Sequence, residues 1–487
     1  MPPHSRVLDD APVRTLDDYL AAGGGRALPL AGKVEPDGVI GALEASGLRG
    51  RGGAGFPTGT KWRTVFDSRS EQLPATVVVN AAEGEPGTFK DRAILRRNPY
   101  RVLEGALVAA ATVGADTVIV AMKASFTPEL ARVRAAIDEI RRAAWLPEGF
   151  EIVVVEGPSH YLYGEETALL EVIAGRNPFP RIAPPFRHGT DELGPDTRSA
   201  ADEAMASETS DTAAAPTLVN NVETMANVPG IVVEGPDWFR SVGTEKSPGT
   251  IVCTVTGATR RHGVGEFPMG TPLREVIDTL GGGARPGERV RAVLSGVANA
   301  LLPGHLLDTP VTYEDLQEAG SGLGSAGFIV FDGTNDPVAV GAGVSRFLSV
   351  ESCGQCTPCK QDGLVISGLL ERLGRNQADG TDLDALRSRL STVTDSARCY
   401  LATQHQVVVE SVLRLFPDSV RAHADQSATE VVPELIVPIL DLGGDDLEGA
   451  TATLDEDHAG KQPDWTHDEE YSGQSPADKV DATEPTL

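Results

Sequence analysis

The chain has 487 residues, of which 40% are hydrophobic and 5% aromatic, enough for two to four domains with large buried cores. Its 70 acidic and 42 basic residues give a formal net charge of −28, which excludes nucleic acid as a natural partner because phosphate would be repelled. No run of about 18 apolar residues is present, and the start MPPHSRVLDD lacks an apolar segment, so we expect neither a membrane span nor a secretory signal. Few cysteines fit a reducing, cytoplasmic location.

After an N-terminal extension, residues 1–36, the chain alternates between strand and helix patterns up to about residue 248. Short β-branched runs at 76–80, 117–122 and 151–157 are typical of buried parallel strands. The segments 100–114 and 127–145 between them have helical spacing. This alternation predicts a Rossmann-like α/β domain over 37–248 with a mostly parallel sheet.

A glycine-rich segment lies at 46–62 and contains Gly50-x-Gly52-x-x-Gly55, which formally matches a dinucleotide fingerprint. It fails as one, because the sequence before it has a helical pattern and Pro57 prevents an immediate helix after it. As a loop it still frees backbone N–H groups for close approach to a phosphate or a flat ring. Nearby side chains add charge and stacking surfaces, namely Arg49, Arg51, Lys61, Phe56 and Trp62. A flexible linker is the plainer interpretation.

Three further segments place polar side chains at the ends of predicted strands or the starts of helices. Ligands of open α/β sheets bind beyond the carboxyl ends of the strands, so we expect these residues to face a ligand. The plainer interpretations are a surface turn at 77–92, acids that suit a helix dipole at 163–175, and helix capping at 216–228. The candidates are Asn80, Glu83, Glu85, Glu165, Glu166, Asn220 and Asn221.

Residues 249–335 show a strand, turn, strand, helix pattern followed by further strands, which predicts a small β-grasp-like α+β domain. Residues 336–424 are mostly helical and carry four of the five cysteines. Cys353, Cys356 and Cys359 are separated by two residues each, and Cys399 follows after 39 more. A bacterial ferredoxin would place its next cysteine three residues on, so a [4Fe–4S] cluster here needs Cys399 as a remote fourth ligand. Zinc and unliganded thiols are the alternatives.

Two segments hold most of the negative charge. Residues 190–213 have seven acids against Arg198, and residues 441–487 have 14 acids against two lysines. Both are rich in small and polar residues, so we expect an acidic insertion at 190–213 and a disordered acidic tail over 425–487. An acidic docking surface for a basic electron-transfer partner is the second interpretation.

The ordered motifs LRGRGGAGFPTGTKW, NAAEGEPGTFKDR, YGEETALLE, PTLVNNVET, GSGLGSAGFIVFD and ESCGQCTPC resemble the NADH-binding flavoprotein subunit of respiratory complex I. The same module occurs in NAD-linked hydrogenases and formate dehydrogenases. The resemblance covers about residues 40–420 and implies NADH oxidation through FMN and a [4Fe–4S] cluster, with a [2Fe–2S] or ferredoxin-like protein or a quinone pathway as acceptor. It also implies that the cysteines hold the cluster, that Gly50, Gly52, Gly53, Gly55, Arg51, Lys61, Asn80, Glu83, Gly164, Glu165, Asn220 and Asn221 surround FMN, and that Phe56, Glu85, Glu166 and Phe186 contact NADH.

Three departures from the family pattern concern the flavin and nucleotide site. Ala82 replaces an acid, Tyr163 replaces a cysteine, and Ala183 replaces a lysine, while Arg187 is a hypothetical substitute for that lysine. These changes favour a divergent paralogue outside complex I. The alternative function is an electron-transfer or scaffold subunit that keeps the cluster and has lost NADH oxidation.

Overall fold

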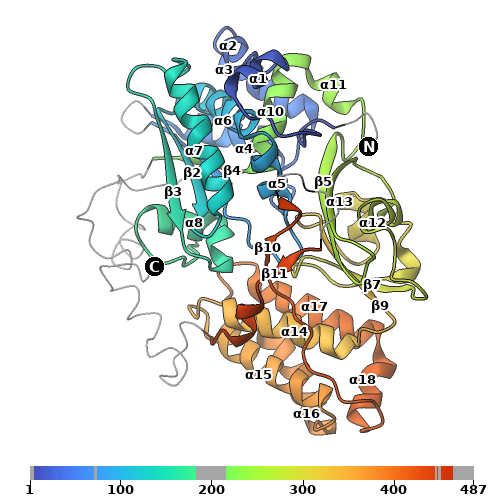
Figure 1. Ribbon diagram of the computed structural model, residues 1–487. Coiled ribbons are helices and arrows are strands. Elements are labelled where there is room, and N and C mark those ends of the chain that lie inside the picture. Colours follow the sequence, from blue (N-terminus) through green and yellow to red (C-terminus); the bar gives the residue numbers. More distant parts are fainter. Residues whose placement is uncertain (1–4, 71–73, 183–214, 445–446, 448–450, 464–487) are drawn as a thin grey trace.

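The structure is a computed structural model that describes residues 5–70, 74–182, 215–444, 447 and 451–463. Figure 1 shows three parts, coloured in chain order: an α/β part in blue to green, a β-rich part in yellow-green, and an orange helical bundle below them. The fold class expected from the sequence is confirmed. Phe186, Ala183, Arg187 and the acidic insertion lie outside the described residues.

A four-stranded parallel sheet forms the centre of the α/β part, with strand order β3-β2-β1-β4. Its strands are β1 (Thr76–Ala81), β2 (Thr117–Lys123), β3 (Glu151–Gly157) and β4 (Thr217–Asn221). The valines of β1 are fully buried, as expected for a strand covered on both faces. The register pairs Asn80 of β1 with Asn221 of β4, so the carboxyl ends of these two strands lie side by side.

Helices lie on both faces of this sheet and pack around it (Figure 1). They are α3 (Pro36–Ser46), α4 (Thr58–Ser68), α5 (Lys90–Arg97), α6 (Pro99–Val113), α7 (Thr127–Arg142), α8 (Glu166–Ile173), α10 (Val222–Glu234) and α11 (Pro236–Arg240). A single 3-10 turn, η1 (Tyr161–Gly164), joins β3 to α8. The sequence pattern at 127–145 predicted a helix, and α7 ends three residues earlier.

The N-terminal extension is part of the first hydrophobic core. Helices α1 (Leu16–Ala21) and α2 (Ala27–Ala31) pack against this core through Leu16, Tyr19 and Ala27. Buried Glu104 of α6 anchors them, since its carboxylate accepts hydrogen bonds from Tyr19 Oη (2.5 Å), Gly25 N (2.9 Å) and Ala27 N (2.7 Å). This charged acceptor satisfies amide groups that would otherwise be buried without partners.

The second part is a five-stranded mixed sheet with strand order β6-β5-β9-β7-β8. Its strands β5 and β9 are parallel, and its other neighbours are antiparallel. Helix α12 covers one face with Leu273, Val276 and Ile277. The elements are β5 (Thr250–Gly257), β6 (Gly263–Pro268), α12 (Leu273–Gly281), β7 (Val290–Ser295), β8 (Leu302–Pro303), η2 (Gly304–Leu306), α13 (Tyr313–Glu318) and β9 (Gly327–Asp332).

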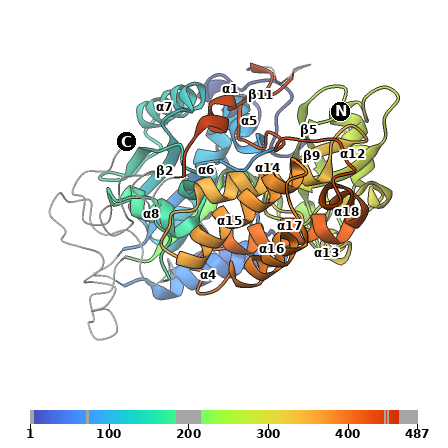
Figure 2. The ribbon, with the colours of Figure 1, turned by 90° about the horizontal axis from the view of Figure 1, so that it is seen from below.

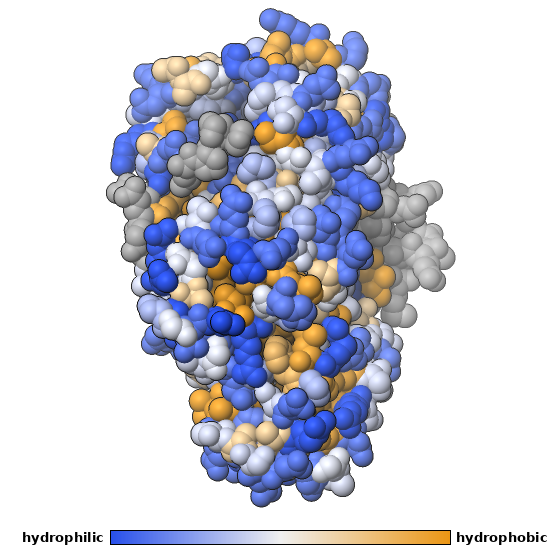
Figure 3. Space-filling model, turned by 90° about the vertical axis from the view of Figure 1, so that its right-hand side faces the viewer, coloured by the Kyte–Doolittle hydropathy of each residue, from blue (hydrophilic) through white to orange (hydrophobic). Residues whose placement is uncertain are grey.

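The helical bundle follows and is seen from below in Figure 2. It consists of α14 (Pro337–Glu351), α15 (Thr357–Gly374), α16 (Gly380–Thr392), α17 (Leu401–Leu415) and α18 (Pro417–Ala424). Among the residues the structure describes, no helix combines the length and apolarity needed to cross a membrane. On the face shown in Figure 3, hydrophilic residues separate small groups of hydrophobic ones.

The sequence predicted a disordered tail from residue 425. The structure instead shows ordered elements within residues 425–444 and 451–463, which we call the C-terminal strap. The strap contains β10 (Ile439–Asp441), β11 (Thr453–Leu454) and η4 (Glu456–Gly460), and β10 pairs antiparallel with β11. The composition of this segment predicted disorder because apolar residues are few. Several of them, including Ile436, Val437 and Ile439, are nevertheless buried. The strap runs from the bundle up to the α/β part (Figure 1).

The anchoring role of Glu104 gives a first prediction. Glu104→Ala should loosen α1 and α2, because several buried donors lose one charged acceptor, at a cost of about 3 kcal/mol in local stability. Limited proteolysis followed by mass spectrometry should show faster cleavage within residues 15–31. Glu148→Ala, at an exposed position, is the control. Equal cleavage rates in the two variants would show that the N-terminal helices are held by apolar packing alone.

Candidate functional site

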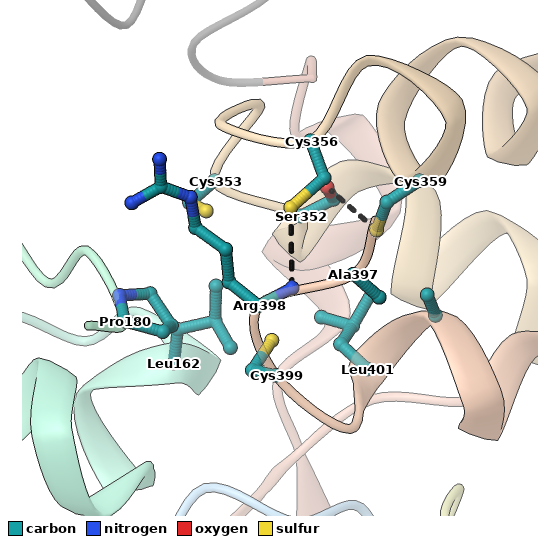
Figure 4. Close-up of a pocket in the computed structure, with 11 residues that line it drawn as sticks. Leu162, Pro180, Ser352, Cys353, Cys356, Cys359, Ala397, Arg398, Cys399 and Leu401 are labelled. Atoms are coloured by element: carbon teal, nitrogen blue, oxygen red, sulfur yellow. Dashed lines mark hydrogen bonds between the residues drawn. The ribbon is translucent and has the colours of Figure 1, made fainter. Parts of the chain in front are cut away.

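Four cysteine side chains line one pocket in the helical bundle (Figure 4). Cys353 lies in the loop after α14, Cys356 is the N-cap of α15, Cys359 is in the first turn of that helix, and Cys399 precedes α17. Apart from the four cysteines, the pocket is lined mainly by apolar or small groups, including Leu162, Pro180 and Ala402. The fold therefore brings the remote Cys399 to the other three cysteines.

Hydrogen-bond donors surround the sulfur atoms. Gln355 Nε2 lies 3.5 Å from Cys353 Sγ, Arg398 N lies 3.4 Å from Cys356 Sγ, and Ser352 Oγ lies 3.4 Å from Cys359 Sγ. Such donors favour thiolate over thiol. Burial acts in the opposite direction and raises the pKa of Cys359 to about 11, so a bound cation is needed to keep these sulfurs ionised at neutral pH.

This donor set fits an iron–sulfur cluster. Among the described residues, no three His, Cys, Asp or Glu side chains converge closely enough to hold a single metal ion. The four sulfurs instead surround a space, as the corner irons of a cubane require. Lys360 adds a buried positive charge beside them, and its ammonium donates to Ser349 O and Ser352 O, both at 2.8 Å.

The glycine loop lies against the ends of β1 and β4. Gly50 N donates to Phe56 O at 2.8 Å, which closes the loop. Gly53 and Gly55 have φ angles of 127° and 64°, which other residues rarely adopt. A Cβ on Gly55 would lie 2.5 Å from the Tyr313 ring, and one on Gly52 would lie 3.4 Å from Asn221. The glycines are thus required by the backbone and by close packing at this point.

The aromatic and basic side chains of the loop differ in placement. Phe56 is 53% exposed, so its ring is free to stack on a ligand. Arg51 is 2% exposed, and its guanidinium donates to Thr250 O at 3.0 Å beside Glu223. The Arg51 side chain therefore joins the α/β part to the second domain and does not point to a ligand, which corrects the expectation for this residue.

Asparagines mark the carboxyl ends of the paired strands. Asn80 Nδ2 donates to Gly164 O at 2.9 Å, and Asn220 Oδ1 accepts from Trp62 Nε1 at 2.8 Å. Asn221 accepts from Lys90 Nζ at 3.0 Å and also caps α10 by accepting from Glu223 N at 3.0 Å. The capping interpretation and the site interpretation of Asn221 are thus compatible.

The start of α8 meets the glycine loop through an ion pair. Lys61 Nζ lies 2.5 Å from Glu166 Oε1, and both side chains are partly exposed. Glu165 accepts from Thr167 N and Ala168 N and is the N-cap of α8. Of the two neighbouring glutamates, Glu165 is used as the helix cap, and the Glu166 side chain remains partly exposed. A Cβ on Gly164 would lie 3.0 Å from Ala82 O, which explains the glycine there.

The two glutamates after β1 are both held by hydrogen bonds within the protein. Glu83 is buried and accepts from Arg92 Nε at 2.9 Å and from Asp91 N at 3.0 Å. Glu85 accepts from Val297 N at 2.6 Å and from Tyr161 Oη at 2.5 Å, and burial raises its pKa. Both carboxylates already have protein partners, so contact with a ligand would require these hydrogen bonds to be shared.

The structure therefore gathers nearly all the described candidates at two neighbouring places. The strand ends, the glycine loop and α8 form the first, and the cysteine pocket is the second. Turn η1 belongs to both, because Leu162 lines the cysteine pocket and Gly164 O accepts from Asn80.

Sequence reasoning missed several residues of this region. Lys90 and Asp91 both contact Asn221. Their opposite charges stand next to each other in the motif GTFKDR, and this pattern could have indicated a buried ion pair. Tyr161 bonds Glu85 and Gln404, which are far apart in the chain, so local pattern could not reveal the contact. The replaced residues Ala82 and Tyr163 lie in one buried cluster behind the sheet, where the Tyr163 ring packs on Gly157.

Comparisons with known proteins agree with this arrangement. The Nuo51 FMN-binding domain matches residues 43–230, the SLBB domain matches 252–297, and the NADH-ubiquinone oxidoreductase-F iron–sulfur binding region matches 339–423. These matches, with the fold and the four cysteines, define a flavin- and iron–sulfur-dependent oxidoreductase component that binds FMN and a [4Fe–4S] cluster.

Relatives of similar length define the family. The second F-type subunit of the NADH-quinone oxidoreductase of Rhizobium meliloti (strain 1021) is 36% identical over 84% of this chain and 94% of that protein. The HndC subunit of the NADP-reducing hydrogenase of Solidesulfovibrio fructosivorans is 34% identical over 84% of this chain and 81% of that protein. The chain belongs to the family of F-type subunits of NADH-quinone oxidoreductase.

Among solved structures, an NAD+-reducing [NiFe]-hydrogenase in the H2-reduced state superposes with a TM-score of 0.71 and 32% identity. The match covers 84% of this chain, which spans 66% of that hydrogenase chain. The likeness therefore extends over most of the fold.

The shared pocket predicts equal roles for the four cysteines. Cys399→Ser should lower bound iron and the cluster EPR signal as far as Cys356→Ser does, because a [4Fe–4S] cluster held by four cysteines takes one thiolate at each iron. Cys253 is fully buried in strand β5, away from the pocket, so Cys253→Ser should keep its iron and serves as the control. Full iron content in Cys399→Ser would mean that another residue supplies the fourth ligand.

Proposed function

We propose that this chain oxidises NADH at FMN and passes the electrons through the [4Fe–4S] cluster to an external protein acceptor. The observation that carries the proposal is the position of η1. This single turn contributes Leu162 to the cysteine pocket and, two residues later, Gly164 to the strand-end site. Adjacent Cα atoms are about 3.8 Å apart, so the two sites are near neighbours.

The residues of the chain have distinct roles in this proposal. The glycine loop offers backbone N–H groups to the phosphate and ring of FMN, and Lys61 adds a positive charge at its edge. The amides of Asn80, Asn220 and Asn221 supply hydrogen bonds at the strand ends. Phe56 and Glu166, both accessible, are left for NADH. When bound, FMN accepts a hydride and releases electrons singly, so the protein needs no general base.

Glu83 and Glu85 keep a supporting role in the proposal. Their carboxylates fix the loop after β1 against Arg92 and Tyr161, and this loop carries Gly84 and Gly87 past the strand ends. Phe186 stays a proposed nucleotide contact from outside the described residues.

The acceptor is proposed to be a [2Fe–2S] or ferredoxin-like protein, within a multi-subunit assembly located in the cytoplasm or on a membrane complex. Relatives from respiratory enzymes and from hydrogenases match with similar identity, 36% and 34%. The assignment to a paralogue outside complex I therefore rests on Ala82, Tyr163 and Ala183 alone.

An anaerobic titration of the cofactor-loaded protein with NADH tests the proposal. Absorbance should show bleaching of the flavin, and EPR should then show the reduced cluster. A cluster that is reduced by dithionite but not by NADH would favour the electron-transfer or scaffold subunit instead.

The accessible acid at the start of α8 gives a sharper prediction. Glu166→Ala should raise the KM for NADH about tenfold to 150-fold, because one hydrogen bond to a charged group contributes roughly 1.5–3 kcal/mol. Bound FMN, measured by its fluorescence after release, should be unchanged. Glu410→Ala, at an exposed site on α17, is the matched control. Loss of FMN with an unaltered KM would assign Glu166 to the flavin.

A further inference from the structure

The C-terminal strap lies beyond the part of the chain that the iron–sulfur family matches, which ends at residue 423. It nevertheless contacts all three parts of the fold. Glu434 N donates to Ala339 O in the bundle (2.9 Å), Arg92 Nη1 donates to Ile439 O (2.6 Å), and Ala452 N donates to His262 Nδ1 (2.9 Å). The strap therefore contacts elements that the flavin and cluster sites depend on.

The end of the strap reaches a buried carboxylate beside the cluster loop. Glu351, the last residue of α14, is 5% exposed. Its Oε1 accepts from His458 Nε2 and from Lys461 Nζ, both at 2.8 Å. Its Oε2 accepts from Tyr161 N at 2.9 Å. One carboxylate thus connects the strap to the first residue of η1.

Ring contacts follow the same path. The Phe347 ring meets Tyr161 edge-on at 5.3 Å and the His458 ring at 5.1 Å. Tyr161 in turn donates to Glu85 (2.5 Å). Two contacts therefore fix Tyr161. Its hydroxyl bonds Glu85 in the loop after β1, and its backbone N–H bonds Glu351. A carboxylate buried with only one partner would be costly, so the two strap donors stabilise the orientation in which Glu351 holds Tyr161 N.

We propose that His458 and Lys461 are positioning residues, which hold turn η1 through Glu351 and so set the spacing between the strand-end site and the cysteine pocket. The positioning itself is a property of the polypeptide. Its effect on electron transfer rests on the proposed function.

Hydrogen exchange measured by mass spectrometry tests the positioning without cofactor turnover. In the full chain carrying His458→Ala and Lys461→Ala, amides of peptides covering 158–165 should exchange about tenfold faster or more, because the acceptor of Tyr161 N is no longer fixed. Among the single variants at position 461, Lys461→Ala should exchange faster, and Lys461→Arg should exchange as slowly as the unaltered chain because it keeps a cationic donor to Glu351. Gln462→Ala, exposed and adjacent, is the control. Unchanged exchange in the double variant and in Lys461→Ala would overturn the proposal.

Stopped-flow reduction of the cofactor-loaded protein tests the consequence. The double variant should reduce flavin at the rate of the unaltered chain but reduce the cluster several-fold more slowly, with equal FMN and iron contents. Equal rates for both steps would overturn the link from η1 to electron transfer. If NADH reduces neither protein, the proposed function fails while the exchange result still decides the positioning role.

Discussion

The register of β1 against β4 is the constraint on which the strand-end site depends. The two strands are far apart in the chain, yet their parallel pairing sets Asn80 beside Asn221. A slip of β4 by one residue would turn Asn220, Asn221 and the apolar residues of that strand to the opposite faces of the sheet. The apolar content of both strands therefore fixes the polar residues at their ends. Glycines then let the loop after α3 approach those ends.

Buried charges hold the loop after β1 and helices α5 and α10 together inside the α/β part. Lys90 lies 3.1 Å from Glu223 and also contacts Asp91, while Arg92 pairs with Glu83. Burial raises the pKa of Asp91 to about 6 in spite of the neighbouring Lys90. Such groups contribute little net stability when paired, but each is costly when a partner is missing. The network therefore favours one relative placement of the loop after β1, helix α5 and helix α10.

Elements whose signal is local could be predicted from the sequence. The structure contains the strand predicted from the valine run at 76–80 and the helices predicted from the spacing of α6 and α7. The four predicted cysteines line one pocket. Cys399 could be paired with the motif because no other cysteine lies near it in the chain. The roles of Arg51 and of the strap could not be predicted. Arg51 is buried by Thr250 and Glu223, which are distant in the chain, and no local pattern encodes such partners. The strap has a composition typical of disorder, yet five buried apolar residues and ion pairs such as Lys461–Glu351 hold it.

The strap also affects the order in which this protein is completed. Domains fold as units during synthesis, beginning at the N-terminus. The flavin domain, the second domain and the cysteine loops are therefore synthesised before Ile439, His458 and Lys461 leave the ribosome. Until then Glu351 lacks the donors His458 and Lys461, and Arg92 lacks the acceptor Ile439 O. The order of the chain thus places the strap partners of Glu351 and Arg92 after all three parts of the fold that the strap joins.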